Sequence, residues 1–204
     1  MSWDENWEQI FQNKEWGKYP AEDLIRFVAK NFYEYKNRKE IKILEIGCGT
    51  GANLWFIARE GFSVYGIDGS KTAIDIAQHR LDKEVKNWAG DLRVGDIIKL
   101  PYEDGVFDAV IDNEAVTHNS FENSKKIYKE ALRVLAPGGK LFSRTFSTGS
   151  WGENTGTQIN ENEWIPSEGP MSLGEFLRFT PHDLIETLFG KFQINEIELL
   201  TRTS

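Results

Sequence analysis

The segment Leu44-Glu45-Ile46-Gly47-Cys48-Gly49-Thr50-Gly51 constrains the fold of this 204-residue chain more than any other. It is an apolar strand that runs into a turn with alternating glycines, and a helix is expected from Ala52. Glycine lets a ligand approach the main chain, and the free N–H groups of a following helix suit a nucleotide-like ligand. The sequence therefore predicts an α/β fold with a ligand site at this turn.

The spacing of the glycines separates this turn from the dinucleotide fingerprint Gly-x-Gly-x-x-Gly, because Gly47, Gly49 and Gly51 alternate. Glu45 stands two residues before the first of them. A carboxylate is unfavourable beside a pyrophosphate but favourable beside a positively charged ligand group, such as an ammonium or a sulfonium. The turn therefore indicates a cationic ligand and disfavours a nicotinamide cofactor.

Apolar strands and amphipathic helices alternate along most of the chain. We predict strands over 41–46, 62–67, 92–94, 107–112 and 140–146, and helices over 20–36, 52–60, 72–81 and 123–135. A further helix is expected to begin at Thr180 as its N-cap and to end at Phe189, and a last strand is expected over 192–203. Nearly continuous apolar strands predict a doubly wound, mainly parallel sheet with helices on both faces.

Further motifs follow in a fixed order. They lie at residues 64–68, 95–97, 100–102, 107–110 and 132–139. With the glycine turn, they make the chain resemble the class I S-adenosylmethionine-dependent methyltransferases, in particular the small soluble type 11/25-like group, over about residues 40–147. The resemblance implies a Rossmann-like sheet whose seventh strand is antiparallel. No segment for that strand follows Ser204, so it is either absent or lies outside this sequence.

The resemblance implies that S-adenosylmethionine binds, with S-adenosylhomocysteine as product. It implies that Asp68 accepts from the ribose hydroxyls, that Asp96 and Ile97 contact the adenine, and that Asn113 and Glu45 flank the methionine part. The alternatives are an N-cap role for Asp68 and a turn role for Asp96. The expected cofactor-binding residues are Glu45, Gly47, Cys48, Gly49, Gly51, Asp68, Gly69, Asp96, Ile97, Asn113, Trp16 and Tyr19.

The acceptor side is expected just past the fourth strand and in a glycine-rich segment over 147–179, which we interpret as a lid. His118 is the candidate general base, and its alternative role is to anchor the loop. Arg144 either binds an acidic group of the acceptor or pairs with a nearby acid. The expected acceptor-binding residues are Glu114, His118, Arg144, Trp151 and Trp164.

Aromatic residues are concentrated in a predicted N-terminal helical cap, residues 1–36. Trp3, Trp7 and Phe11 are spaced as one face of a helix, which favours packing in the core. Alternatively, Trp16 or Tyr19 covers the cofactor and helps to bind a cation.

Composition narrows the class of protein. The net charge is −8 with a sequence pI near 5.0, so a nucleic acid is not expected as a partner. No stretch reaches the ~20 apolar residues of a membrane span, and the acidic N-terminus is unlike a signal peptide, so a cytoplasmic location is expected. The lone Cys48 is assigned to packing, and Arg144 stands where a metal-dependent site would need an acid, so metal-free chemistry is expected.

The sequence thus predicts one domain, residues 1–204, that transfers a methyl group to an oxygen or nitrogen of a small molecule: an amine, a sugar or a phosphorylated metabolite. A non-catalytic cofactor-binding subunit and, less favoured, a nicotinamide-dependent oxidoreductase are the alternatives. An unpaired sixth strand would leave a sheet edge through which the chain could form a homodimer.

Overall fold

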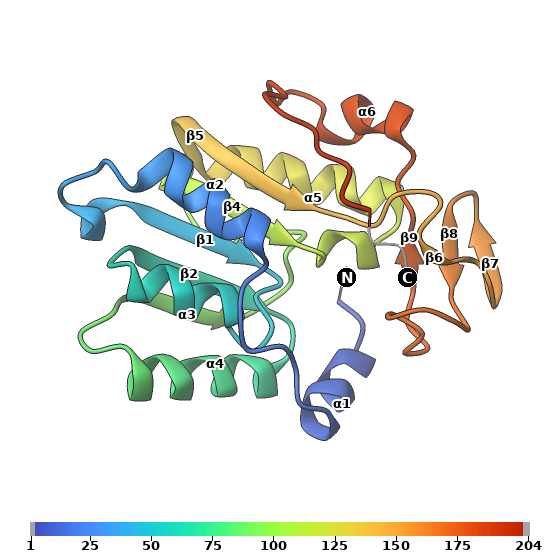
Figure 1. Cartoon of the computed structure of the whole chain (residues 1–204), viewed down its shortest axis with the longest axis horizontal. Helices are drawn as coiled ribbons and strands as arrows, with labels where there is room; N and C mark the ends of the chain where they lie inside the picture. Colours follow the sequence, from blue (N-terminus) through green and yellow to red (C-terminus); the bar gives the residue numbers. More distant parts are fainter. Residues whose placement is uncertain (1–2, 202–204) are drawn as a thin grey trace.

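The computed structural model describes residues 3–201 and contains a central parallel sheet (Figure 1). Its five strands run in the order β3-β2-β1-β4-β5. The bounds are β1 Lys42–Ile46, β2 Ser63–Asp68, β3 Ala89–Val94, β4 Phe107–Asn113 and β5 Leu135–Arg144. The order reverses between β1 and β4, which is where doubly wound sheets bind ligands beyond the carboxyl ends of their strands. The predicted fold class is confirmed.

Helices cover both faces of this sheet because its strand side chains alternate between two apolar clusters. Ile43 and Ala109 pack with α2, α3 and α4, whereas Leu44 and Val110 pack with α5 and α6. The helices are α1 Asn6–Asn13, α2 Glu22–Phe32, α3 Ala52–Arg59, α4 Lys71–Glu84, α5 Phe121–Val134 and α6 Ile185–Phe189. Short 3₁₀ turns are η1 Arg38–Glu40, η2 Val116–His118 and η3 His182–Leu184.

The segment that the sequence identified as a lid is more ordered than a long loop. It contains β6 Trp151–Asn154 and an antiparallel sheet of β7 Thr157–Asn160, β8 Glu163–Ile165 and β9 Leu177–Arg178. Figure 1 shows these short strands beyond the arrowheads of β4 and β5. They therefore lie at the edge of the main sheet where a ligand is expected.

The C-terminal part corrects two predictions. Residues 192–201 form no strand, and residues 202–204 lie outside the described part, so the predicted sixth strand is wrong as far as the structure describes it. In the described chain β5, and not a sixth strand, is the edge strand on this side of the main sheet, and a homodimer through an unpaired sheet edge stays a prediction. The N-cap of the 3₁₀ turn that leads into α6 is Pro181, not Thr180, whose hydroxyl instead accepts a hydrogen bond from Arg178 Nε at 3.3 Å.

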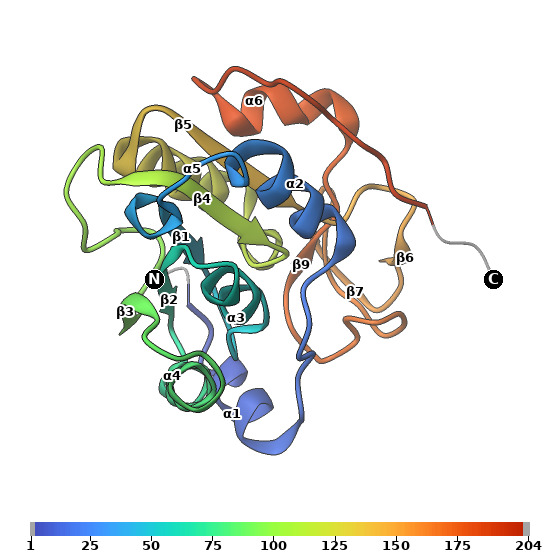
Figure 2. The same ribbon diagram turned by 60° about the vertical axis from the view of Figure 1, so that its left-hand side comes forward.

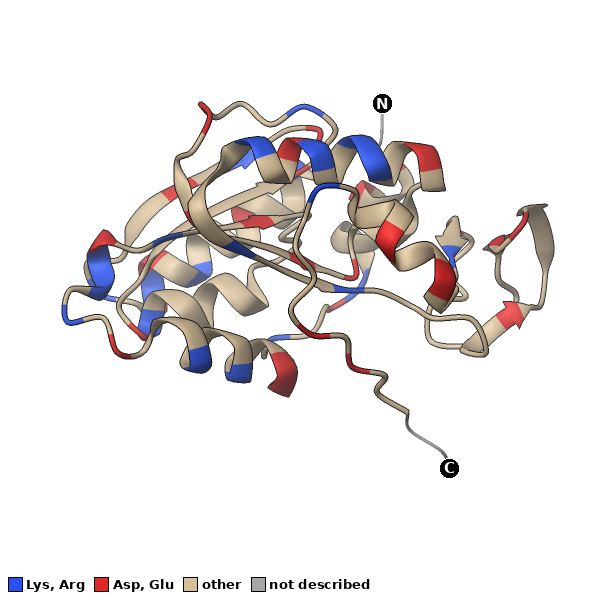
Figure 3. Ribbon diagram, turned by 90° about the horizontal axis from the view of Figure 1, so that it is seen from above, with Lys and Arg blue, Asp and Glu red and all other residues tan. Residues whose placement is uncertain are grey.

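Surface charge follows no single stripe along the ribbon. Figure 3 shows basic and acidic positions interspersed on the helices and loops. Over residues 3–201, no helix combines the length and apolar character needed to cross a bilayer.

Candidate functional site

The glycine turn between β1 and α3 is held by close packing against two other elements. Gly47 and Gly51 have φ angles of +65° and +78°, a region that L side chains rarely adopt. A Cβ on Gly47 would lie 2.3 Å from the Cβ of Ala115, and one on Gly51 would lie 2.8 Å from the Cβ of Ala77. Glycine at these two positions is therefore a requirement of the fold itself.

Unpartnered acceptor atoms gather where β1 and β4 end. Glu45 is 2 % exposed; its Oε1 accepts from Asn53 Nδ2 at 2.5 Å, while its Oε2 has no hydrogen-bond partner among the described residues. Asn113, on the neighbouring strand, has a buried Oδ1 that is likewise unpartnered within residues 3–201. Burial raises the pKa of Glu45 to about 8. Two buried acceptors without donors fit a ligand that brings its own N–H groups.

Asp68 ends β2 with a buried carboxylate that orders the turn beside it. One oxygen accepts from the backbone N–H of Gly49 and the other from that of Ser70, each at 2.8 Å. The N-cap of α4 is Ser70, whose hydroxyl accepts from Ala73 N at 3.0 Å, so the N-cap alternative for Asp68 is wrong. Burial raises the pKa of Asp68.

Other predicted cofactor residues have largely structural contacts. Asp96 lies in the turn after β3, and its Oδ1 accepts from Ile98 N at 3.1 Å, as the turn alternative expects. Ile97 packs in the apolar cluster under α5, and Cys48 packs in the cluster on the opposite face of the sheet. Burial raises the pKa of Cys48 well above its usual value, which suits the packing role given to this thiol.

Helix α1 covers the glycine turn from outside, beside α4 (Figures 1 and 2). The ring of Phe11 reaches to 3.5 Å from where a Cβ of Gly49 would be, and the ring of Trp3 fills the space above Gly69. Glu8 fixes α1 to the start of α4, because its carboxylate accepts from the hydroxyls of Ser70 and Thr72 at 2.5 Å each. These hydrogen bonds lower the pKa of Glu8 to about 2.

The two aromatic residues proposed to cover the cofactor lie farther along the chain. Trp16 packs edge-on against Trp7 and Phe11, with ring centroids 5.7 Å and 5.6 Å away. Tyr19 is 74 % exposed and contacts the ring of Trp55 rather than the glycine turn. Phe11 is thus the aromatic residue against Gly49 of the turn, and Trp3 lies over Gly69 after β2. The cofactor-covering role of Trp16 or Tyr19 stays a prediction.

His118 stands at a junction of three chain segments. Its Nδ1 lies 2.8 Å from the carbonyl oxygen of Phe176, and the ring of Trp7 packs edge-on at 4.8 Å. A carbonyl only accepts, so Nδ1 carries the proton and Nε2 is left with its lone pair. Burial lowers the pKa of His118 to about 4. The imidazole is therefore neutral and anchored, and it keeps one basic nitrogen.

Strand β9 fixes the loop around His118. The carbonyl of Arg178 accepts from Thr117 Oγ1 at 2.7 Å, and the Arg178 guanidinium donates to the carbonyl of Asn119 at 3.0 Å and to the hydroxyl of Ser124. Both neighbours of His118 in sequence are thus bonded to one buried residue. This role of Arg178 has no signal in the sequence, since it depends on contacts about 60 residues apart.

Two predicted acceptor residues bind each other. Arg144 Nε lies 3.1 Å from a carboxylate oxygen of Glu114, and Arg144 Nη1 lies 3.7 Å from Asp23 Oδ1. Pairing with local acids is the alternative that the structure shows for Arg144. Trp151 is 71 % exposed, and Trp164 is partly buried in β8. The structure does not bring these two rings to His118 by any described ring contact.

A family comparison agrees with this geometry. Residues 44–143 match the model of a family described as "Methyltransferase domain". This region is a class I S-adenosylmethionine-dependent methyltransferase domain. The match begins at the strand before the glycine turn and ends in β5, so it includes all the strands of the main sheet except parts of β1 and β5.

Curated relatives of the methyltransferase domain act on different acceptors by name. The chain is 31% identical over 121 residues to norajmaline N-methyltransferase of Rauvolfia serpentina, covering 59% of this chain and 40% of the relative. It is 38% identical over 106 residues to demethylmenaquinone methyltransferase of Tropheryma whipplei, covering 52% and 42%. The chain thus spans less than half the length of these relatives.

Solved structures share the fold. A protein from Pyrococcus horikoshii OT3 aligns with a TM-score of 0.66 at 21% identity, over 89% of this chain and 85% of that one. An S-adenosylmethionine-dependent methyltransferase from Methanosarcina mazei aligns with a TM-score of 0.60 at 24% identity, over 74% and 79%. At these identities the likeness shows the architecture alone.

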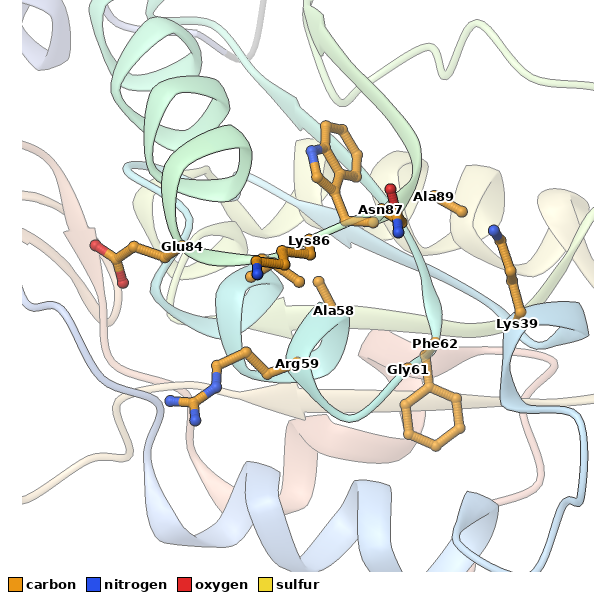
Figure 4. A pocket seen from close by; sticks show the side chains of 11 residues that line it. Lys39, Ala58, Arg59, Gly61, Phe62, Glu84, Lys86, Asn87 and Ala89 are labelled. Carbon is orange, nitrogen blue, oxygen red and sulfur yellow. The ribbon is translucent and has the colours of Figure 1, made fainter.

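A hollow of about 400 Å³ opens at the other end of the methyltransferase sheet (Figure 4). It is lined by the ends of α3 and α4 and the beginning of β3, including Arg59, Lys86 and Ala89. These are the amino ends of the strands, whereas ligands of such sheets lie beyond the carboxyl ends. We therefore assign the functional site to the glycine turn and not to this hollow.

Proposed function

We propose that this protein transfers a methyl group from S-adenosylmethionine to a nitrogen or oxygen of a small molecule. When bound, this cofactor supplies a methyl carbon on a positively charged sulfur that is a good leaving group. The protein then has to align the two reactants and exclude water. Relatives named as an N-methyltransferase and as a tocopherol O-methyltransferase support both acceptor atoms equally.

The observation that carries the proposal is the pair of unpartnered oxygens on Glu45 and Asn113. An ammonium group brings N–H donors and a positive charge to a buried carboxylate whose Oε2 has no donor and which forms no ion pair within residues 3–201. The amino-acid end of the cofactor has such a group, and the Glu45 carboxylate stands beside the glycine turn that would receive it.

Asp68 can take part without giving up its backbone contacts. Each carboxylate oxygen offers two lone pairs, and each uses one for the N–H of Gly49 or Ser70. The remaining lone pairs can accept from the two hydroxyls of a ribose. Asp96 and Ile97 follow on the neighbouring strand end, where the adenine would lie.

His118 is proposed as the base that removes a proton from the acceptor. Its Nδ1–H is held by the Phe176 carbonyl, so Nε2 is the atom that can receive the proton. The segment over 147–179 is proposed to close on the acceptor, with Trp151 and Trp164 excluding water. Its amide hydrogen exchange should slow in the ternary complex, and unchanged exchange would show that the segment is not a lid.

Thermal unfolding with added ligands tests the proposal directly. S-adenosylmethionine and S-adenosylhomocysteine should raise the melting temperature of the protein, whereas NADH should not, because only the former carry an ammonium for Glu45. Equal stabilisation by NADH would contradict the proposal. A screen of small molecules with S-adenosylmethionine, in which mass spectrometry detects any methylated product, then distinguishes an enzyme from a non-catalytic cofactor-binding subunit.

A further inference from the structure

Two carboxyl groups meet between the N-terminal segment and the chain that leads into β9. Glu175 is 4 % exposed, and its side chain contacts the carboxyl of Asp4 and the amide of Asn6. Its Oε2 has no hydrogen-bond partner anywhere in the described residues. A buried acceptor of this kind costs free energy unless a donor reaches it.

No positive side chain in residues 3–201 forms an ion pair with Glu175 or Asp4. Two carboxylates in contact repel each other, and burial strengthens that repulsion. Both effects would be relieved by a cation that donates hydrogen bonds. The pair is therefore unsatisfied in a way that specifies the charge and the hydrogen-bonding type of a ligand.

This acid pair adjoins the residues proposed for catalysis. Phe176, the next residue after Glu175, holds the His118 ring through its carbonyl at 2.8 Å. Trp7, one residue after Asn6, packs edge-on against the His118 ring, with 4.8 Å between centroids. The acid pair is thus next in sequence to both residues that contact the His118 ring, and an aromatic side chain such as Trp7 attracts organic cations.

We propose that the acceptor of this methyltransferase is an amine, whose ammonium group binds between Glu175, Asp4 and the ring of Trp7. This inference rests on the proposed function and narrows its acceptor class. A phosphorylated or carboxylated acceptor would meet two unpaired acids here, since Arg144 is already bound to Glu114 and Asp23. A neutral hydroxyl would leave the acid pair without a charge partner.

The same arrangement accounts for the proton in an N-methylation. The bound ammonium gives its proton to Nε2 of His118, an uphill step because burial lowers the pKa of His118 to about 4, and this frees the nitrogen lone pair. That lone pair forms the N–C bond to the methyl carbon, and the C–S bond breaks with its electron pair remaining on sulfur. Atoms and charge balance: the proton takes the charge of the ammonium to the imidazole, and the methyl group takes the charge of the sulfonium to the nitrogen, so the product is a methylated ammonium.

The test measures binding of an organic cation in the complex with S-adenosylhomocysteine, by NMR signals of the His118 ring and the Trp7 indole. Phenethylamine hydrochloride is the probe, and 2-phenylethanol, which shares its carbon skeleton but carries no charge, is the control. We expect saturable shifts with the amine only. Glu175→Gln should weaken its binding at least about tenfold, as for loss of one partner of a buried charge pair.

Glu168→Gln is the matched control variant, because Glu168 is an exposed acid of the same segment. It should leave amine binding unchanged. The affinity of each variant for S-adenosylhomocysteine shows whether the protein is folded and its cofactor site intact. If the native protein does not bind S-adenosylhomocysteine, that result contradicts the proposed function and not the amine assignment. Equal binding of alcohol and amine, no saturable shift, or an unchanged affinity in Glu175→Gln would overturn the amine assignment.

Discussion

The cofactor side and the acceptor side of this domain are built differently. Around Glu45 and Asp68, the side chains come from ends of adjacent parallel strands and from one short turn. Around His118, they come from α1, η2 and the chain beside β9, which are joined only by tertiary contacts. The first is positioned by the register of a buried sheet, and the second by contacts between separate segments.

The difference teaches where specificity can change without loss of the fold. A strand end in the middle of a sheet is fixed by neighbours on both sides, so its side chains tolerate little movement. On the acceptor side, the sequence of one chain segment can change while the other segments around His118 keep their structure. The different acceptors in the names of the relatives agree with this division.

The largest effect is expected on the cofactor side, from Gly47→Ala. Its φ angle of +65° would cost a side chain about 1–3 kcal/mol, and the added Cβ would also collide with Ala115. We expect loss of cofactor binding and a marked fall in melting temperature. Gly105→Ala is the control, because φ is +70° but open space surrounds it. If both variants melt alike, the contact with Ala115 is unimportant.

On the acceptor side, His118→Ala should lower turnover about 10²–10⁴-fold, as expected for loss of a general base, and leave cofactor affinity unchanged. The ordinary pKa of a histidine would place control of the rate near pH 6.5, but burial lowers the pKa of His118 to about 4. NMR titration of the ring should therefore show a midpoint well below 6.5. Wild-type turnover in the variant would leave His118 as an anchor only.

The sign of the stability effect follows from that shift. A lowered pKa means that His118 favours the folded state above pH 6.5, and this contribution is lost as the pH falls through 6.5 toward 4. The free energy of unfolding of the native protein should fall more steeply in this range than that of His118→Ala. Parallel curves would contradict the burial of the ring.

A smaller effect is expected from Glu45→Gln, about a 10–100-fold loss of cofactor affinity, because an amide cannot neutralise an ammonium. With a pKa of about 8, Glu45 is mostly protonated at pH 7 and must release a proton when a cation binds. Calorimetry in buffers of different ionisation enthalpy should detect this proton in the native protein and not in the variant.

The pH dependence of stability gives a second check on Glu45. Its raised pKa means that its contribution to stability is complete below about 4.5 and is lost as the pH rises through about 8. Without cofactor, Glu45→Gln should therefore be the more stable protein at pH 8.5. Lower stability of the variant at this pH would show that the carboxylate has a partner when the protein is free.

Arg144→Ala should have the smallest effect, less than about 1 kcal/mol on stability, since its ion pairs are partly exposed to water. Cofactor affinity should not change. Any consequence should appear as a change in the acceptor concentration that gives half the maximal rate. A large loss of cofactor affinity would instead assign Arg144 to the cofactor side and contradict its place on the acceptor side.

Hydrophobic pattern predicted the central fold well, because buried parallel strands are nearly continuous apolar runs. It failed where burial is incomplete. Only the end of edge strand β3 was predicted, since its first residues, Ala89, Gly90 and Asp91, have no apolar pattern. The apolar positions over 192–201 suggested a strand, yet that segment lies along α2 with Glu196 2.9 Å from Lys30. Pairing depends on an available partner, which a local pattern does not reveal.

The residues of the candidate site also differ in how far the sequence could predict them. Glu45, Asp68 and Asn113 follow strands and were predicted by position. Glu175 and Arg178 become significant only through partners far away in the chain. Strands β7 to β9 were not predicted, because their segment is rich in glycine, proline and polar residues, a composition that is typical of loops.

The packing of the glycine turn bears on how far a motif can identify a function. Gly47 and Gly51 are required by Ala115 and Ala77, whether or not a ligand binds. A descendant that had lost its catalytic role would still be selected to keep both, as long as it kept this fold. Gly49 also has a positive φ angle, +50°, so a side chain there would strain the backbone, but its Cβ would meet only the ring of Phe11 at an ordinary contact distance of 3.5 Å. Of the three glycines, it is therefore the one whose replacement disturbs the packing of the fold least. Drift at this single position would be the first sign in a lineage that the ligand has been abandoned.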